Sequence, residues 1–319
     1  MKRAFGAPKR PGASKGPGAP KAPGAAKTFG APKVSGAAKG KRPQRLQTKS
    51  GTAAGVSKPR RSPRSAEVVA VPPAGADEPL RIAKAMARAG LCSRREAERW
   101  IEQRRVSVNG RLLTTPAFEV TPKDKVLVDG QPLPLAEPPR LWRYYKPRGL
   151  VTTHNDPQGR PTVFQSLPED LPRVVSVGRL DFNSEGLLLL TNDGALARFM
   201  ELPSTGWLRR SRARAHGRVA QADLDKLKDG IEIEGVRYGP VEATLDTVQG
   251  ANTWLTIGLR EGKNREVRRI LAHLGLEVNR LIRISYGPFQ LLDLKPGEAD
   301  SVKRRVLVDQ LGPRLAAEL

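Results

Sequence analysis

The sequence is poor in the residues that build disulfide frameworks and metal sites. Its 319 residues contain one cysteine, Cys92, and three histidines, His154, His216 and His273. A single cysteine excludes an internal disulfide, and three scattered histidines give no spaced set of metal ligands. We therefore expect a protein without a metal.

Long apolar runs and an excess of acidic residues are also missing. No run approaches the roughly 18 apolar residues of a membrane-spanning helix, and the N-terminal segment lacks the apolar core of a signal peptide. The chain has 56 lysine and arginine residues against 32 aspartate and glutamate residues, a formal charge of +24. Such a charge favours a polyanion as partner. We expect a cytoplasmic protein that acts on RNA and binds no membrane.

Residues 1–78 are of low complexity, and a Gly-Ala-x-Lys unit recurs every six residues from Gly6 to Lys39. Residues 1–76 hold 17 basic residues and one acidic residue, so they contribute +16 of the formal charge. Such a segment has little to bury, which predicts a disordered tail. A basic tail adds weak affinity for phosphate backbones without reading their sequence. The alternative is a solvated tail that only aids solubility.

A small unit of two helices and short strands is expected after the tail. Apolar residues recur at helical spacing from Leu80, and Gly90 ends this helix. A second helix starts at Ser93, where Glu96 completes a capping box. Val106–Val108 and Val126–Val128 each lead into a tight turn, which predicts two small strands.

Near the middle of the chain, Gly178–Gly186 separates two apolar runs, Val174–Val177 and Leu187–Leu190. Each run is short and flanked by glycine or turn residues, which predicts a strand buried on both faces. Asp181 then lies on a connection at the mouth of a sheet, and loops on a rigid scaffold often carry the chemistry. An ordinary structural turn is the alternative, because Asp, Asn and Gly are common turn residues.

A second basic element follows almost ninety residues later. Apolar residues at helical spacing from Val267 to Leu274 predict an amphipathic helix that Asn264 caps and Gly275 ends. Arg265 and Arg268 fall outside its apolar stripe. They line a functional surface or, as the alternative, a solvated basic face.

The remaining segments predict strands and few helices. Strands are expected at 208–216, 241–245 and 255–259, and short helices at 195–201 and 222–227. Many strands with few helices indicate an α+β domain on a mixed sheet.

Two motifs resemble those of a known family. Gly178–Gly194 reads Gly-Arg-Leu-Asp-x-x-Ser-x-Gly-Leu-Leu-Leu-Leu-Thr-Asn-Asp-Gly, and Glu261–Arg269 reads Glu-Gly-Lys-x-Arg-Glu-Val-Arg-Arg. Both are similar to motifs of the pseudouridine synthases that modify ribosomal RNA, in the subfamily of RsuA and RluB. The two-helix unit, with Cys-Ser-Arg-Arg-Glu-Ala between its helices, resembles an S4-type RNA-binding domain. The resemblance covers about residues 80–300.

This resemblance implies a fold class and a division of the chain. The expected fold is α+β, with a small S4-type RNA-binding domain before a pseudouridine synthase catalytic domain on a mixed, mostly antiparallel sheet. The expected parts are a disordered basic tail (1–78), the S4-type domain (79–136), a proline-rich linker (137–140) and the catalytic domain (141–312).

The resemblance also implies roles for individual residues. Asp181 is expected to act as nucleophile or base, with Arg268 paired to it. Burial favours the neutral form of an acid, and a guanidinium would keep a buried Asp181 charged. Substrate-binding roles are expected for Arg179, Ser211 and Tyr286, and RNA-binding roles for Ser93, Arg94, Arg95 and Arg265. No cofactor is expected, because the isomerisation oxidises and adds nothing.

One position departs from the family pattern. The family generally has a tyrosine where this chain has Ser211, and a serine supplies no ring to pack on a uracil. We therefore expect reduced turnover with intact RNA binding.

The predicted function is isomerisation of uridine to pseudouridine in ribosomal RNA. The large-subunit 23S rRNA is preferred, because the basic extension and the arginine-rich strand near Arg209 look more like RluB. A 16S rRNA synthase and a non-catalytic RNA-binding ribosome-assembly factor are the alternatives. Expected partners are ribosomal RNA and pre-ribosomal particles, with the protein itself a monomer.

Overall fold

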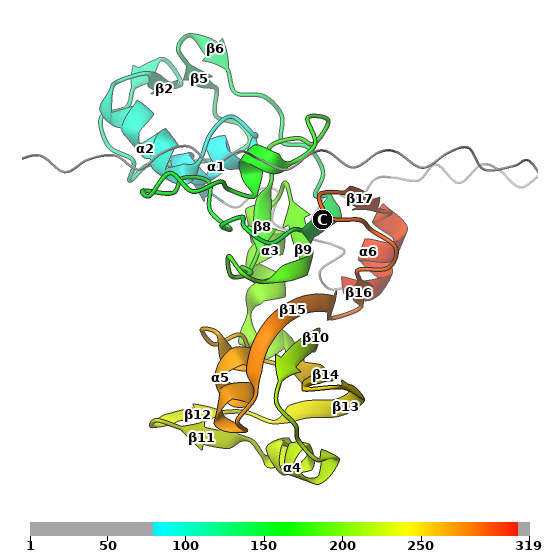
Figure 1. Cartoon of the computed structure of the whole chain (residues 1–319). Coiled ribbons are helices and arrows are strands. Elements are labelled where there is room, and N and C mark those ends of the chain that lie inside the picture. Colours follow the sequence, from blue (N-terminus) through cyan, green and yellow to red (C-terminus); the bar gives the residue numbers. More distant parts are fainter. Residues whose placement is uncertain (1–78, 312–319) are drawn as a thin grey trace, which may run out of the picture. The chain divides into compact units, whose positions relative to one another are not determined.

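The computed structural model describes residues 79–311 (Figure 1). The predicted disordered tail, residues 1–78, lies outside the described residues, as do residues 312–319. Between residues 79 and 311, no helix is long and apolar enough to cross a membrane.

The first part of the described chain is a small unit of two helices and six short strands. Its elements are β1 (Leu80–Arg81), α1 (Ile82–Arg88), α2 (Arg94–Glu102), β2 (Val106–Val108), β3 (Arg111–Leu112), β4 (Glu119–Val120), β5 (Val126–Val128) and β6 (Gln131–Pro132). Four of the strands form a sheet in the order β3-β2-β5-β6, and β1 pairs with β4. The helices and strands expected here are confirmed.

The predicted capping box sets the start of α2. Ser93 Oγ accepts a hydrogen bond from the Glu96 N–H at 3.1 Å, and Glu96 Oε2 accepts one from the Ser93 N–H at 3.3 Å. These bonds satisfy N–H groups that a helix leaves unpaired at its start. Ile82 of α1 and Ile101 of α2 are fully buried in one core with Val106. The unit therefore has an apolar core of its own.

A nine-stranded mixed sheet organises the rest of the described chain. Its strands are β7 (Leu141–Lys146), β8 (Val175–Val177), β9 (Glu185–Thr191), β10 (Arg209–His216), β13 (Val241–Gln249), β14 (Asn252–Leu259), β15 (Glu277–Tyr286), β16 (Phe289–Gln290) and β17 (Ala299–Val302). The main order is β13-β14-β10-β15-β9-β7-β17, while β8 pairs with β9 and β16 pairs with β15. Only the β9–β15 pair is parallel among these strands, so the predicted mixed, mostly antiparallel sheet is confirmed.

Helices and one hairpin accompany this sheet. They are η1 (Phe164–Ser166), α3 (Gly194–Glu201), η2 (Pro203–Thr205), α4 (Gln221–Asp225), η3 (Lys226–Asp229), β11 (Ile231–Ile233), β12 (Val236–Tyr238), α5 (Glu266–His273) and α6 (Arg304–Leu311). Figure 1 shows α5 lying along β15. Val267 and Ile270 of α5 join the core formed with Leu255 and Ile257 of β14. The amphipathic pattern therefore attaches α5 to one face of the sheet.

β9 is buried over all seven of its residues. Successive side chains of a strand point to opposite faces, so Leu187 and Leu189 join a core with α3, while Leu188 and Leu190 join a second core with Trp142. The strand predicted after Asp181, buried on both faces, is confirmed.

Two local predictions are wrong. β8 spans three residues, and only Val177 is fully buried, because the strand pairs with β9 alone. Asn264 does not cap α5: the N-cap position is Arg265, with φ +51° and no side-chain cap. The carboxylate of Glu266 instead accepts a hydrogen bond from the Lys263 N–H at 2.9 Å, which fixes the turn before the helix.

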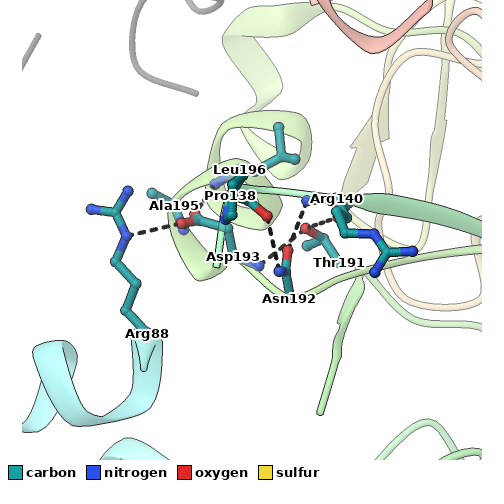
Figure 2. Close-up of polar contacts among 8 residues, drawn as sticks. All are labelled: Arg88, Pro138, Arg140, Thr191, Asn192, Asp193, Ala195 and Leu196. Atoms are coloured by element: carbon teal, nitrogen blue, oxygen red, sulfur yellow. Dashed lines mark hydrogen bonds and ion pairs between the residues drawn. The ribbon is translucent and has the colours of Figure 1, made fainter. Parts of the chain in front are cut away.

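The turn after β9 begins α3 (Figure 2). Asp193 is the N-cap, and its Oδ1 accepts hydrogen bonds from two N–H groups of the first turn at 2.6 and 2.9 Å. Its Oδ2 also forms an ion pair with Arg88 at 3.3 Å. The side chain of Asn192 bonds to main-chain groups of residues 138–140. Asn192 and Asp193, at the end of the Gly178–Gly194 motif, therefore have a structural role.

Candidate active site

Asp181 lies on the loop of residues 178–184, between β8 and β9. Its side chain is exposed, which corrects the expectation of a buried acid. Burial begins at Ser184, which is 2 % exposed, where the chain enters β9. The flanking apolar runs bury the strands and leave the connection between them at the surface.

A buried lysine holds the main chain of this loop. Lys146 is fully buried at the end of β7, and its Nζ donates hydrogen bonds to the carbonyl oxygens of Asp181 at 3.1 Å, Ser184 at 2.9 Å and Pro147 at 3.0 Å. Burial lowers the pKa of Lys146 to about 8, and the negative charges of Asp181 and Glu185 oppose this shift. The lysine therefore fixes the main chain of the loop from the buried side.

Other segments hold the start of the loop. Thr152 Oγ1 donates a hydrogen bond to the Leu180 carbonyl oxygen at 2.9 Å, and the Gly178 N–H donates one to Glu201 Oε1 at 2.6 Å. Because its main chain is fixed before a ligand arrives, the loop can present Asp181 in one position without ordering it during binding.

Arg268 reaches the same loop from α5 but makes no direct ion pair with Asp181, which corrects the expected pairing. Its Nη2 donates a hydrogen bond to the Asn183 carbonyl oxygen at 3.2 Å, and its Nη1 donates one to the Val278 carbonyl oxygen at 3.0 Å. Burial lowers the pKa of Arg268, and the charge of Asp181 opposes this shift. Two of its N–H donors bond to main-chain oxygens, one of them on the loop that carries Asp181, so Arg268 acts on this loop.

Asp181 lines two hollows that share part of their walls. The small hollow, of about 140 Å³, also includes Ser211 and Leu281. The large hollow, of about 900 Å³, extends along residues 151–160 to Tyr286. Six basic side chains line the small hollow, namely Arg179, Arg209, Lys263, Arg265, Arg268 and Arg283, against the three acids Asp181, Glu261 and Glu266. This excess of basic groups suits a polyanionic ligand.

Ser211 lies in the wall of the small hollow. It is 9 % exposed on β10 and pairs with Arg283 of β15. The β10–β15 ladder is irregular between Arg210 and Ser211. Such bulges re-aim side chains and are frequent beside active sites. The structure therefore brings Ser211 and Asp181 to one hollow.

Tyr286 does not offer a free aromatic face. It is 1 % exposed, and its hydroxyl donates a hydrogen bond to the Met200 carbonyl oxygen at 3.0 Å and accepts one from Arg209 Nη2 at 2.9 Å. The Arg209 guanidinium carbon lies 4.6 Å from the ring centroid. The expected direct contact with substrate is corrected, because the ring is covered and supports Arg209.

The remaining candidates fall into two groups. Arg179 and Arg265 are exposed and line both hollows with Asp181. Arg94 and Arg95 are exposed on the first turn of α2, and the Ser93 hydroxyl is engaged in the capping box. These three residues of the small unit do not line the hollows.

Sequence reasoning missed Lys146, Arg209 and Arg283. β15, which carries Arg283, was not predicted because charged and apolar residues mix along it without a regular period. A signal was present nonetheless. Arg283 interrupts an apolar run before Tyr286, and Lys146 follows two aromatic residues, so both are basic residues within apolar surroundings in the sequence.

Each of the two domains of the described chain matches a known protein family. Residues 80–126 match the S4 domain family, and residues 140–273 match the RNA pseudouridylate synthase family. The chain thus joins an RNA-binding domain to an RNA-modifying catalytic domain. Between residues 79 and 311, no three His, Cys, Asp or Glu side chains are grouped to hold a metal ion.

Individual proteins similar to this chain identify its family. An uncharacterized RNA pseudouridine synthase of Rickettsia felis is 47 % identical over 230 residues, which cover 71 % of this chain and 98 % of that protein. Ribosomal large subunit pseudouridine synthase B of Salmonella typhi is 43 % identical over 222 residues, covering 66 % and 75 %. The crystal structure of a pseudouridylate synthase matches with a TM-score of 0.51 at 25 % identity, covering 73 % and 100 %. The chain belongs to the RNA pseudouridine synthase family and is an enzyme that forms pseudouridine in RNA.

Proposed function

We propose that this enzyme isomerises a uridine of 23S ribosomal RNA, with Asp181 as its catalytic residue. The observation that carries the proposal is the exposed carboxylate of Asp181, held on an anchored loop in a hollow lined by six basic side chains. The choice of the large subunit is supported by the Salmonella typhi relative, whose name assigns it to that subunit.

The reaction moves one bond of the nucleotide. The bond between ribose C1′ and N1 breaks, the base turns, and C5 bonds to C1′. N1 gains a proton and C5 loses its hydrogen, so the product is an isomer. A carboxylate such as Asp181 can attack the sugar or remove a proton, and the ionised form is needed for either step.

The surrounding residues bind and position the RNA in this proposal. Taking a base out of its stack costs a few kcal/mol, and contacts to the flipped nucleotide offset this cost. Arg179 and Arg265 offer guanidinium groups to the phosphate backbone at the hollows. Arg268 keeps the Asp181 loop in place through Asn183. Arg94 and Arg95 add backbone contacts from the S4 domain, which raise affinity without reading sequence.

A deletion strain tests the assignment. Pseudouridines are mapped in the 16S and 23S rRNA of the strain, and then after complementation with wild type, Asp181→Asn or Asp156→Asn. Asp156 is the matched control, because it also lines the large hollow but is bound to Arg160. We expect one 23S pseudouridine to disappear on deletion and to return with wild type and Asp156→Asn, and not with Asp181→Asn.

Other outcomes would contradict the proposal. Loss of a 16S position would identify a small-subunit enzyme, and unchanged 16S and 23S rRNA would identify another RNA as substrate. Restoration by Asp181→Asn would remove the catalytic role of Asp181.

We extend the proposal to the setting of the reaction. The enzyme acts in the cytoplasm as a monomer on pre-ribosomal particles, where a uridine that is later buried is still accessible. Sedimentation of cell extracts tests this, with the enzyme expected beside precursor particles and absent from mature ribosomes. A protein found only in the ribosome-free fractions would contradict it.

A further inference from the structure

Within residues 79–311, Arg283 is a buried cation that uses only one of its three nitrogens in a hydrogen bond. It is 7 % exposed on β15, and its Nε donates a hydrogen bond to the Leu187 carbonyl oxygen at 2.7 Å. Its Nη2 is buried without a hydrogen-bond partner. An unsatisfied buried donor destabilises the folded protein, and more so when it is charged, so such a group calls for an explanation. Arg283 lines both hollows with Asp181, where a bound molecule could meet it.

A second guanidinium lies against the same aromatic ring. The guanidinium carbons of Arg209 and Arg283 lie 4.6 and 5.2 Å from the ring centroid of Tyr286. Arg209 is fixed by hydrogen bonds to the Tyr286 hydroxyl at 2.9 Å and to the Arg260 carbonyl oxygen at 3.2 Å. These contacts hold two like charges around one ring at the wall of both hollows.

Neither cation has a carboxylate partner in residues 79–311. The contrast with a neighbour on the same strand is direct. Arg212 of β10 also stacks on an aromatic ring, that of Trp254 at 4.7 Å, but it forms an ion pair with Asp246 at 3.3 Å. The chain therefore neutralises one stacked arginine of β10 and leaves the other with its charge directed at the hollows.

We propose that Arg209 and Arg283 form a binding site for a phosphodiester group of the RNA, next to the nucleotide on which Asp181 acts. Guanidinium groups match phosphate oxygens in charge and geometry and bind them through paired N–H donors. The hydrogen-bonding groups that the two side chains offer are all donors, so the ligand must supply acceptors. The location beside the reacting nucleotide rests on the proposed function, whereas the phosphate contact itself does not.

The charge of Arg283 persists at neutral pH. Burial lowers its pKa to about 10, the proximity of Arg209 acts in the same direction, and Tyr286 opposes both. The side chain is therefore a buried cation in the free protein, and an anion that reaches Nη2 would relieve its desolvation and its repulsion from Arg209.

The salt dependence of RNA binding tests the proposal. The probe is a single-stranded oligouridylate of about ten nucleotides, long enough to fill a typical single-strand site. Its affinity for the full chain is measured by fluorescence anisotropy between about 50 and 200 mM salt, where each phosphate contact contributes about 0.7 to the slope of log K against log salt. Because the two arginines share one phosphate, we expect Arg209→Gln and Arg283→Gln each to reduce the slope, by up to about 0.7, and Arg212→Gln to leave it unchanged.

Every other pattern of slopes overturns the proposal. Unchanged slopes in Arg209→Gln and Arg283→Gln would show that no phosphate is bound there. Weaker binding with an unchanged slope would place a neutral group, such as a base carbonyl or a hydroxyl, at the site. Arg283→Lys keeps the charge and should recover most of the slope. If Arg283→Gln fails to fold by circular dichroism, the half-buried Arg209 decides the result.

A second arm separates RNA from free phosphate. Thermal unfolding of wild type and Arg283→Lys is followed with inorganic phosphate at constant ionic strength. We expect the same small response in both proteins, and a stabilisation specific to wild type would assign the site to a free anion. Oligouridylate binding needs no turnover, so the slope test remains valid even if the deletion strain loses no rRNA pseudouridine. Conversely, an unchanged slope would contradict the phosphate site and would leave the rRNA assignment unaffected.

Discussion

Lys146 Nζ lies 3.1 Å from the main-chain oxygen of Asp181, so a buried ammonium group supports the loop that carries an exposed carboxylate. The same nitrogen reaches the carbonyl oxygen of Ser184 at 2.9 Å, where the loop enters β9. Lys146 is the last residue of β7, Ser184 directly precedes β9, and these two strands are neighbours in the sheet. The sheet thus fixes the position of the Asp181 main chain.

Replacing Lys146 by Met should disturb the position of Asp181 without weakening the binding of RNA. The change removes the donors for the carbonyl oxygens of Asp181 and Ser184, and a displacement of about 1 Å in a catalytic group can cost roughly 100-fold in rate. We expect kcat/KM to fall about 10- to 100-fold while RNA affinity stays close to wild type. Tritium release from RNA labelled at uridine C5 measures the first quantity, and fluorescence anisotropy measures the second. Lys295→Met, at an exposed position, is the control, and equal kcat/KM values in the two variants would show that the Lys146 contact is dispensable.

Glu266 should make the stability of the enzyme depend on pH. Burial raises the pKa of Glu266 from its ordinary 4.5 to about 7, and the neighbouring Glu261 adds to this rise. Between these two pH values the folded protein keeps a proton that the unfolded chain has released, so the free energy of unfolding falls as the pH rises through this window. Glu266→Gln removes this titration and keeps an acceptor for the Lys263 N–H. We expect it to raise the free energy of unfolding at pH 8 by about 1–3 kcal/mol, with little change at pH 4.5.

Urea denaturation of wild type and variant at both pH values gives the measurement. Glu298 supplies a matched control, because it accepts a hydrogen bond from the N–H of Lys295, three residues earlier, at 2.8 Å but is exposed. Glu298→Gln should show no comparable gain at pH 8. A Glu266→Gln protein with the same stability difference at both pH values would contradict the raised pKa.

Gly186 should tolerate no side chain. A Cβ at this position would lie 2.4 Å from the carbonyl oxygen and 2.8 Å from the nitrogen of Arg283, and the φ angle of Gly186 is +101°. Gly186→Ala must therefore open the parallel β9–β15 pair. Gly130 is the control, because its φ is +79° but nothing lies within 4 Å of its Cβ position, so Gly130→Ala reports backbone strain alone. We expect Gly186→Ala to lower the free energy of unfolding by at least about 2 kcal/mol more than Gly130→Ala in urea titrations. Equal losses would show that the ladder absorbs the methyl group.

The parts of the molecule that follow from local patterns could be predicted from the sequence. The Leu187–Leu190 run and the turn residues before it identify β9 and the Asp181 loop, because a short apolar run between turn residues has few other structures to adopt. The capping box at Ser93 is predicted for the same reason, since its hydrogen bonds join residues three positions apart.

The parts that depend on distant contacts could not be predicted. Arg268 was assigned to Asp181, but its guanidinium bonds to carbonyl oxygens that only the folded chain brings near, those of Asn183 and Val278. Arg283 is buried because β15 pairs with β9 and β10, and its own sequence has no strand period. A pairing between segments about a hundred residues apart leaves little trace in either segment.

Ser211 offers the most direct test of how far this chain departs from the family pattern. The serine lies in the wall of the small hollow with Asp181, where a tyrosine ring was expected to pack on the uracil. Stacking of an aromatic side chain on a base is worth about 1–3 kcal/mol. A ring at this position would stabilise the flipped base by about this amount and could raise the reaction rate by about 10-fold. We therefore expect Ser211→Tyr to raise the single-turnover rate by about that factor, with RNA affinity nearly unchanged.

Two further variants identify the cause of any gain at Ser211. Ser211→Phe supplies the ring without the hydroxyl and should match Ser211→Tyr if packing on the base is what the wild type lacks. Ser211→Ala removes the hydroxyl and should stay at the wild-type rate. Because the small hollow holds about 140 Å³, a ring could also fill it and exclude the uracil. A single-turnover rate at or below that of wild type in both ring variants would show that the serine leaves room the substrate needs, and that turnover in this enzyme is not limited by the missing tyrosine.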